Sequence, residues 1–296
     1  MAMDDRTDEE RDKNSPKYIY KSRYSPVYSY ISNHEYVQDF HNDYPKMPID
    51  KNIYQTLLEN DFSERLAMHF SNLLVRDPLV IFDEKINLQE KDVSHFENFN
   101  STNWNSLRFK PPRKEDNDNC FKIEIRPCEL QLTAFENASM MTFCLIFSQL
   151  VLKKDVNFII PITKVDENFE RAHDSNAFEN QLFSFRIDGL RNYKKESKLC
   201  ENNYLSHGNT LQKDYFDEVG NSENIRELTL KQIFCGTEEH QYEGLLNVMH
   251  EFVEERILIP EVKEIIKTHL NFIESRVKGK RLYFNILKYF YRKIMD

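Results

Sequence analysis

Apolar residues recur at helical spacing in three segments before residue 189. The first runs from about Ile53 to Val75, and a proline three residues later ends it. The second, Ala134 to Leu152, is apolar nearly all round, which is typical of a helix inside a core. A third helix is predicted over residues 169–185.

The clearest strand lies between Cys120 and Leu132, because side chains of two kinds alternate there. One set is apolar and the other charged: Phe121, Ile123 and Ile125 against Lys122, Glu124 and Arg126. A period of two places the two sets on opposite faces of a strand. The pattern therefore predicts one apolar face and one face that carries a cation, an anion and a cation.

The remaining pattern divides the chain by composition. Residues 1–50 are polar and rich in tyrosine, and predict an irregular segment with one short helix around 27–31. From Gly189 to Asn224 the sequence is rich in Lys, Asn, Ser and Glu, which predicts a flexible loop or insertion. Three helical patterns follow, over 228–255 with a break at Gly236, over 260–276 and over 282–294.

Composition excludes several classes of protein. The 40 basic and 49 acidic residues give a net charge of −9, which disfavours nucleic acid and anionic membranes as partners. The N-terminus has no apolar signal, and the longest nearly apolar run, 140–152, is too short to span a bilayer. We therefore expect a soluble, cytoplasmic protein that binds neither membrane nor nucleic acid.

The positions of the glycines and cysteines exclude further kinds of binding site. All six glycines lie at or beyond Gly189, so the first 188 residues cannot form a glycine-rich phosphate loop. The five cysteines include no CxxC pair, which disfavours a zinc ribbon or a disulfide scaffold. Any nucleotide must then be held by side chains and metal.

Two stretches could carry chemistry. On the charged strand face, Glu124 could ligate Mg²⁺ and Arg126 could bind phosphate or carboxylate, although weak ion pairs on a solvated strand explain the same pattern. The segment 101–112 holds the single tryptophan, Trp104, with Arg108 and Lys110, which suits stacking on a ring or binding an anion. A loop anchored by one buried tryptophan is the alternative there.

Several blocks of the sequence resemble the catalytic subunit of eukaryotic glutamate–cysteine ligase. The block FKIEIRPCELQLTAFENAS, residues 121–139, is similar to that family's signature around R-V-E-F-R-P. Further blocks follow the family's order over residues 3 to about 175: MDDRTDEERD, LLVRDPLVIFDEKI, HFENFNSTNWNSLRFKPPR and IIPITKVDENFERA. Ala134 stands where the family has an acidic residue, which puts the start of the following helix in question.

The resemblance implies roles for five residues. Glu124 matches a carboxylate that helps to hold Mg²⁺, and Arg126, two positions on, matches the catalytic arginine that contacts anionic groups of the ligand. Trp104 matches a tryptophan that forms a wall of the substrate and nucleotide region. Arg108 and Lys110 match the cations that follow it.

The resemblance also implies a reaction and a fold. The family uses ATP and Mg²⁺ to join L-glutamate to L-cysteine, giving γ-glutamylcysteine in the first step of glutathione biosynthesis. We expect an α+β fold in which antiparallel strands complete a curved, glutamine-synthetase-like sheet backed by helices. Residues 1–188 would be the C-terminal part of the catalytic domain, 189–224 a flexible loop or insertion and 225–296 a helical tail.

Family members are longer, and their N-terminal portion carries most of the metal-binding carboxylates. We therefore expect the isolated chain to be inactive, with a missing N-terminal half or a modifier subunit as its partner. The alternative is a truncated, non-catalytic relic that serves as an interaction or regulatory module.

Overall fold

A computed structural model describes residues 5–15, 18–44, 47–76, 79–83, 86–87, 93–103, 105–110, 112, 121–195 and 224–279. Contacts divide the chain into two units. Unit 1 comprises Met1–Cys128 and Pro161–His173, and unit 2 comprises Glu129–Ile160 and Asp174–Asp296. The units cut across the ranges predicted from composition, since the chain passes from one to the other three times.

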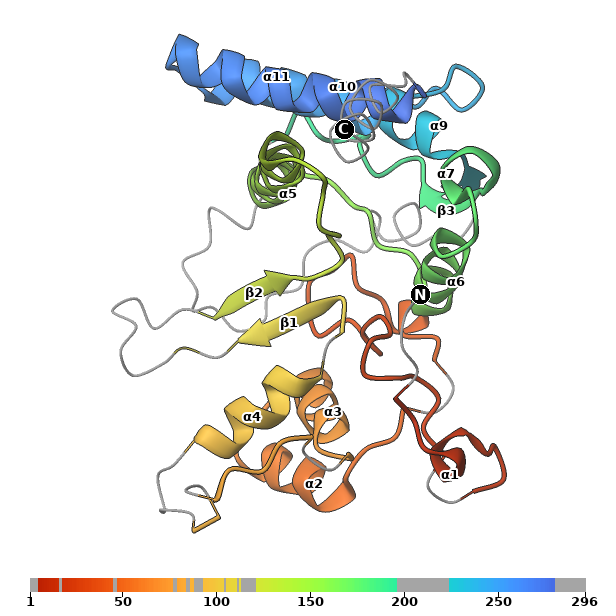
Figure 1. The fold of residues 1–296 in the computed structure, drawn as a ribbon, viewed down its shortest axis with the longest axis vertical. Coiled ribbons are helices and arrows are strands. Elements are labelled where there is room, and N and C mark those ends of the chain that lie inside the picture. Colours follow the sequence, from red (N-terminus) through yellow and green to blue (C-terminus); the bar gives the residue numbers. More distant parts are fainter. Residues whose placement is uncertain are drawn as a thin grey trace, which may run out of the picture. The chain divides into compact units, whose positions relative to one another are not determined.

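Unit 1 contains short helices and one β-hairpin (Figure 1). Its elements are α1 (Asp8–Arg11), the 3-10 helix η1 (Asp39–His41), α2 (Lys51–Glu59), α3 (Glu64–Leu73), α4 (Ser94–Thr102), β1 (Leu107–Lys110), β2 (Lys122–Ile125) and α6 (Ile162–Ala172). The buried Phe70 of α3 meets the rings of Phe96 on α4 and Phe109 on β1. This aromatic cluster attaches the hairpin to the helices that precede it.

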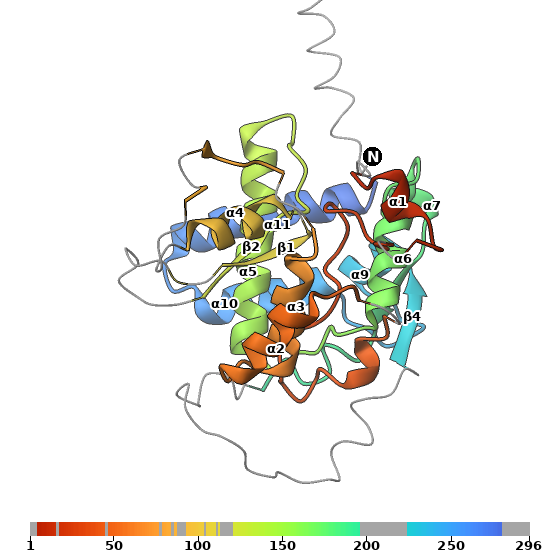
Figure 2. The same ribbon diagram turned by 90° about the horizontal axis from the view of Figure 1, so that it is seen from below.

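Unit 2 is mainly helical. It contains α5 (Ala134–Lys153), α7 (Ala177–Asn180), β3 (Phe183–Arg186), β4 (Ile225–Leu228), α9 (Leu230–Cys235), α10 (Leu245–Arg256) and α11 (Pro260–Val277). Helix α5 packs against α11 and α10, and the core includes Leu150, Val248, Met249, Val253 and Leu270, each fully shielded from solvent (Figures 1 and 2). Across the described residues the fold is α+β, with helices and two small antiparallel sheets.

Helix α5 begins at a complete capping box despite Ala134. The Thr133 hydroxyl accepts a hydrogen bond from the amide of Glu136, and the Glu136 carboxylate accepts one from the amide of Thr133. By length and composition α5 is long and apolar enough to cross a membrane, which corrects the expectation that the apolar run over 140–152 is too short; the core helix of a soluble protein passes the same test. Helix α5 does enter the core of unit 2, through Ile146 and Leu150, but the described residues of that unit cover only one of its faces.

Three predictions of secondary structure need correction. The helix expected over 53–75 is two helices, α2 and α3, because Asp61 adopts a left-handed conformation between them. The end of the helix expected over 169–185 is strand β3, which pairs with β4. No helix forms at 27–31, where the Asn42 side chain instead bonds both backbone groups of Tyr30.

Part of the predicted loop at 189–224 is ordered. Residues 189–195 form turns in which Leu190 and Tyr193 are buried in the core of unit 2. Residues 196–223, and the helix predicted over 282–294, lie outside the described residues.

Candidate functional site

The charged face of the hairpin brings together residues that are distant in sequence. Strands β1 and β2 pair antiparallel, so that Arg108 lies opposite Glu124 and Lys110 opposite Lys122. The amide of Arg126 donates to the carbonyl of Ser106, 3.0 Å away, which continues the pairing one residue beyond β2. Alternation along both strands therefore gathers charged side chains on one face, as the sequence predicted.

Three cations surround the single carboxylate of Glu124. Arg126 Nε donates to Glu124 Oε1 at 2.7 Å, Lys110 Nζ bonds Oε2, and Arg108 Nη1 lies 3.8 Å from Oε2. The hydrogen bonds from Lys110 and Arg126 lower the pKa of Glu124 to about 2, so it is ionised at neutral pH. We call Arg108, Lys110, Glu124 and Arg126 the hairpin cluster.

The loop after α4 fixes Arg126. Arg126 Nη1 donates to the carbonyl oxygen of Asn103 at 2.9 Å, and the Asn103 side chain donates in turn to the carbonyl of Phe99. Asn100, on the same helix, donates to the carbonyl of Phe109 in β1. Sequence reasoning missed both asparagines, although both lie in the block that surrounds Trp104; Trp104 itself is outside the described residues.

The hairpin cluster suits an anion better than a cation. It combines three positive charges with one negative charge, and the guanidinium groups of Arg108 and Arg126 are mostly buried. Phosphate and carboxylate groups are the ligands that such a set binds, with arginine offering paired donors.

Magnesium does not fit these residues alone. Both oxygens of Glu124 are engaged by cations, and the described residues contain no group of three His, Cys, Asp or Glu side chains that could hold a metal ion. Mg²⁺ prefers several oxygen ligands in octahedral arrangement. Glu124 as a metal ligand thus stays a prediction, and it requires oxygen ligands beyond those of the hairpin cluster.

A cavity in unit 1, separate from the hairpin cluster, was not predicted. About 240 Å³ in volume, it is lined in part by Tyr20, Lys21, Asp166 and Glu170. Lys21 Nζ lies 2.7 Å from Asp166 Oδ1, and burial lowers the pKa of Lys21 and raises that of Asp166. Such a buried pair orders the packing of α6, and no pattern in the sequence joins residues 145 positions apart.

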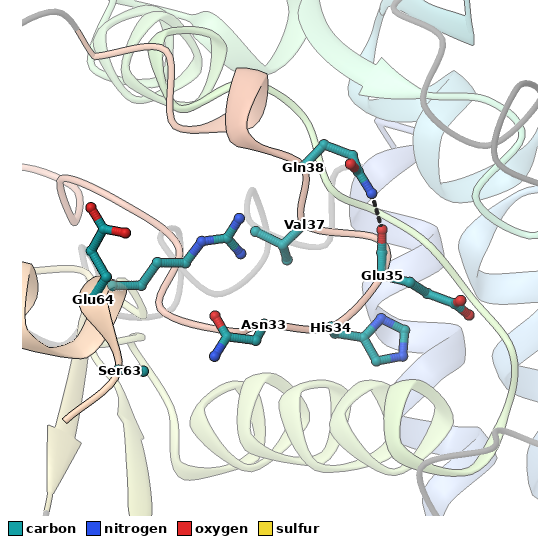
Figure 3. Close-up of a pocket in the computed structure, with 8 residues that line it drawn as sticks. Asn33, His34, Glu35, Val37, Gln38, Ser63 and Glu64 are labelled. Carbon is teal, nitrogen blue, oxygen red and sulfur yellow. Dashed lines mark hydrogen bonds between the residues drawn. The ribbon is translucent and has the colours of Figure 1, made fainter. Parts of the chain in front are cut away.

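The pocket in Figure 3 lies between the loop 33–38 and the start of α3. Its volume is about 260 Å³, and Gln38 bonds the backbone carbonyl of Glu35 on its wall. The guanidinium of Arg65 is held by Asp39 and by the carbonyl of Ser32. Its lining sets one arginine against two carboxylates, Glu35 and Glu64, so this pocket lacks the excess of positive charge that the hairpin cluster has.

Comparison with known proteins shows the family of this chain. The family described as glutamate–cysteine ligase matches residues 1–292, so the chain belongs to that family of ligases. Similar proteins are the glutamate–cysteine ligase of Dictyostelium discoideum, 35% identical over 95% of this chain, and the Homo sapiens catalytic subunit, 34% identical over 94%. The Neurospora crassa enzyme is 46% identical over 62% of the chain and 26% of its own length.

The chain spans about 42% of the length of the Dictyostelium and human relatives. It therefore corresponds to one region of a larger protein in those organisms. The hairpin cluster lies inside this matched region, as do both asparagines that position it.

Proposed function

We propose that this chain supplies the anion-binding strands of a glutamate–cysteine ligase, which joins L-glutamate to L-cysteine with ATP to give γ-glutamylcysteine. The observation that carries the proposal is the hairpin cluster, three cations about one carboxylate in a member of this family. ATP and the glutamate carboxylate are both anionic, and charge must be neutralised to bring them together. The relatives' names supply the reaction.

Each residue of the cluster has a part in this proposal. Arg126 is the group that would contact the ligand, since its Nη1 is fixed by Asn103 while its Nε is shared with Glu124. Arg108 and Lys110 would bind phosphate oxygens, and Trp104 would form an adjoining wall. Glu124 holds the cations in place before the ligand arrives, and any role in binding Mg²⁺ would be shared with other ligands.

The hairpin would belong to a larger, curved sheet. Its second face is apolar and partly exposed: Phe109 meets the ring of Phe70, but 67% of Ile123 and 45% of Ile125 are accessible. An exposed apolar face on a two-stranded sheet is unusual in a folded protein, and further strands or helices would normally cover it. Additional chain of the kind that the longer relatives possess would provide the cover, and a modifier subunit is a further partner, since the human relative is named a catalytic subunit.

A chimeric enzyme tests this function. In the Dictyostelium enzyme, the matched region is replaced by the present chain, and formation of γ-glutamylcysteine from glutamate, cysteine and MgATP is measured. We expect activity, and we expect Arg126→Gln to reduce kcat/KM by about two orders of magnitude or more, as loss of an electrostatic stabiliser does.

Arg226→Gln is the matched control, because Arg226 is an exposed arginine on a strand of unit 2. It should leave kcat/KM unchanged. A folded chimera that forms no product, or one in which both arginine variants behave alike, would show that the hairpin cluster does not serve this reaction.

A further inference from the structure

Helix α5 carries an apolar seam that the described residues of unit 2 leave uncovered. The seam residues are spaced four, three, four, three and four apart: Ala134, Ala138, Met141, Leu145, Ser148 and Leu152. The larger side chains among them are 73%, 60% and 50% exposed at Met141, Leu145 and Leu152 respectively. The only charged residues of the helix, Glu136 and Lys153, lie off this seam.

The opposite face of α5 is already occupied by unit 2. Ile146 and Leu150 are buried in the core, and the Phe143 ring stacks on Phe234 of α9. Near the N-terminus of α5, the Ser139 hydroxyl lies 2.8 Å from His269 Nδ1 on α11. The seam is therefore a second packing surface on a helix whose first packing surface is complete.

The spacing of the seam identifies the shape of its occupant. Alternating steps of four and three keep side chains in line along a helix and are the pattern that packs against another helix in a coiled-coil-like interface. The seam spans 19 residues, from Ala134 to Leu152, and is about 27 Å long, enough for five turns of a partner helix. Small residues at Ala134, Ala138 and Ser148 let the two backbones approach closely.

We propose that the occupant is an amphipathic helix from the part of a glutamate–cysteine ligase that this chain does not match, a proposal that rests on the proposed function. The matched region makes up only 42% of the Dictyostelium relative, so most of that protein lies outside it. A surface that is interior in the whole enzyme would be exposed in this portion alone. The seam has that character, being apolar, uncharged and shaped for a helix.

Two other occupants fit the structure less well. A lipid bilayer would surround α5 on all sides, but its other face is covered by protein helices and includes the buried Glu136. A second copy of this chain would bury the seam without explaining the size of the relatives. Both are outcomes of the test below.

The test compares Met141 in two settings, the isolated chain and the chimeric enzyme described above. Oxidation of single methionines by dilute hydrogen peroxide is followed by tandem mass spectrometry. In the isolated chain Met141 should oxidise readily, whereas in the chimera its rate should fall by about tenfold or more. Met249, which is fully buried in unit 2, is the internal reference and should be slow in both.

Substitution gives an independent readout. Met141→Glu with Leu145→Glu should hardly change the Tm of the isolated chain, where both side chains are exposed, but should lower that of the chimera by several degrees. The swapped pair Met141→Leu and Leu145→Met should be silent in both. Lys153→Glu alters net charge by the same −2 on the same helix, off the seam, and should change the Tm of chain and chimera by equal, small amounts.

Three results would overturn the proposal: equal oxidation of Met141 in chain and chimera, protection that rises with the concentration of the chain alone, or protection by anionic lipid vesicles. The second would assign the seam to a second copy and the third to a membrane. Catalysis is not the readout. A folded, inactive chimera that protects Met141 would leave the seam intact and count only against the proposed function.

Discussion

Glu124→Gln removes the one negative charge of the hairpin cluster while keeping the size of the side chain. A carboxyl whose pKa falls from 4.5 to about 2 would gain up to about 3 kcal/mol in a shielded site. Since 35% of the Glu124 side chain faces solvent, screening reduces that gain, and we expect the variant to lose about 1 kcal/mol of stability at pH 7. The sequence alone, taking the face as solvated, predicts about 0.5 kcal/mol.

The pH dependence of this loss has a definite sign. Because the folded-state pKa is depressed, the stabilisation is complete above pH 4.5 and disappears as the pH falls from 4.5 towards 2. The wild type should therefore approach the variant in stability over that interval. Urea denaturation followed by tryptophan fluorescence measures it, since the single tryptophan, Trp104, falls in the sequence range of unit 1.

Glu227→Gln on β4 is the matched control, an exposed strand carboxylate in unit 2 that should leave this transition unchanged. In the chimera, Glu124→Gln should also lower activity by about a hundredfold. Partial recovery at high Mg²⁺ would support the predicted metal role of Glu124. Equal unfolding midpoints for wild type and variant at pH 7 would refute the reasoning about stability, and unchanged kinetics at every Mg²⁺ concentration would refute the metal role.

Three further predictions concern stability. His69 has a buried Nε2 with no hydrogen-bond partner among the described residues, and burial lowers the pKa of His69 from 6.5 to about 4. Because the folded state favours the neutral imidazole, the free energy of unfolding should fall by about 2 kcal/mol between pH 7 and pH 5. His69→Gln should remove most of that pH dependence, as measured by urea titration. Lys21→Met leaves Asp166 buried without its cation and should cost about 3 kcal/mol of stability, whereas adding Asp166→Asn should recover part of that loss. Chemical denaturation of both variants checks this, and a single variant as stable as the wild type would contradict it. Thr133→Ala breaks the capping box of α5 and should cost about 1 kcal/mol in thermal unfolding, while Thr142→Ala in mid-helix should cost less.

Elements that depend on local signals could be predicted. Helix α5 begins directly after Thr133, as its pattern indicates, and α11 begins at Pro260, where a proline suits the first turn. Strand β3 was missed because its pairing partner, β4, lies about 40 residues further along the chain. Periodicity within a window carries no information on such a distant partner.

The hairpin cluster also combines features that local sequence patterns predict with features that depend on distant parts of the chain. Alternation in β2 placed Lys122, Glu124 and Arg126 on one face, but the contact of Arg126 with the Asn103 carbonyl depends on how the loop after α4 is folded. Every residue has a backbone carbonyl whatever its type, so no sequence pattern could have identified this hydrogen-bond partner of Arg126. The role of Trp104 stays a prediction.

The order of elements along the chain has a consequence for synthesis on the ribosome. Helix α5 ends at Lys153, yet the helices that cover its buried face, α9, α10 and α11, begin at Leu230, Leu245 and Pro260. Roughly 80 residues must be added before the first of them is made, which takes about 4–15 s at ordinary rates of elongation. During that interval both faces of a strongly apolar helix are exposed on the nascent chain, which makes it a natural binding site for chaperones and the point at which misfolding would begin.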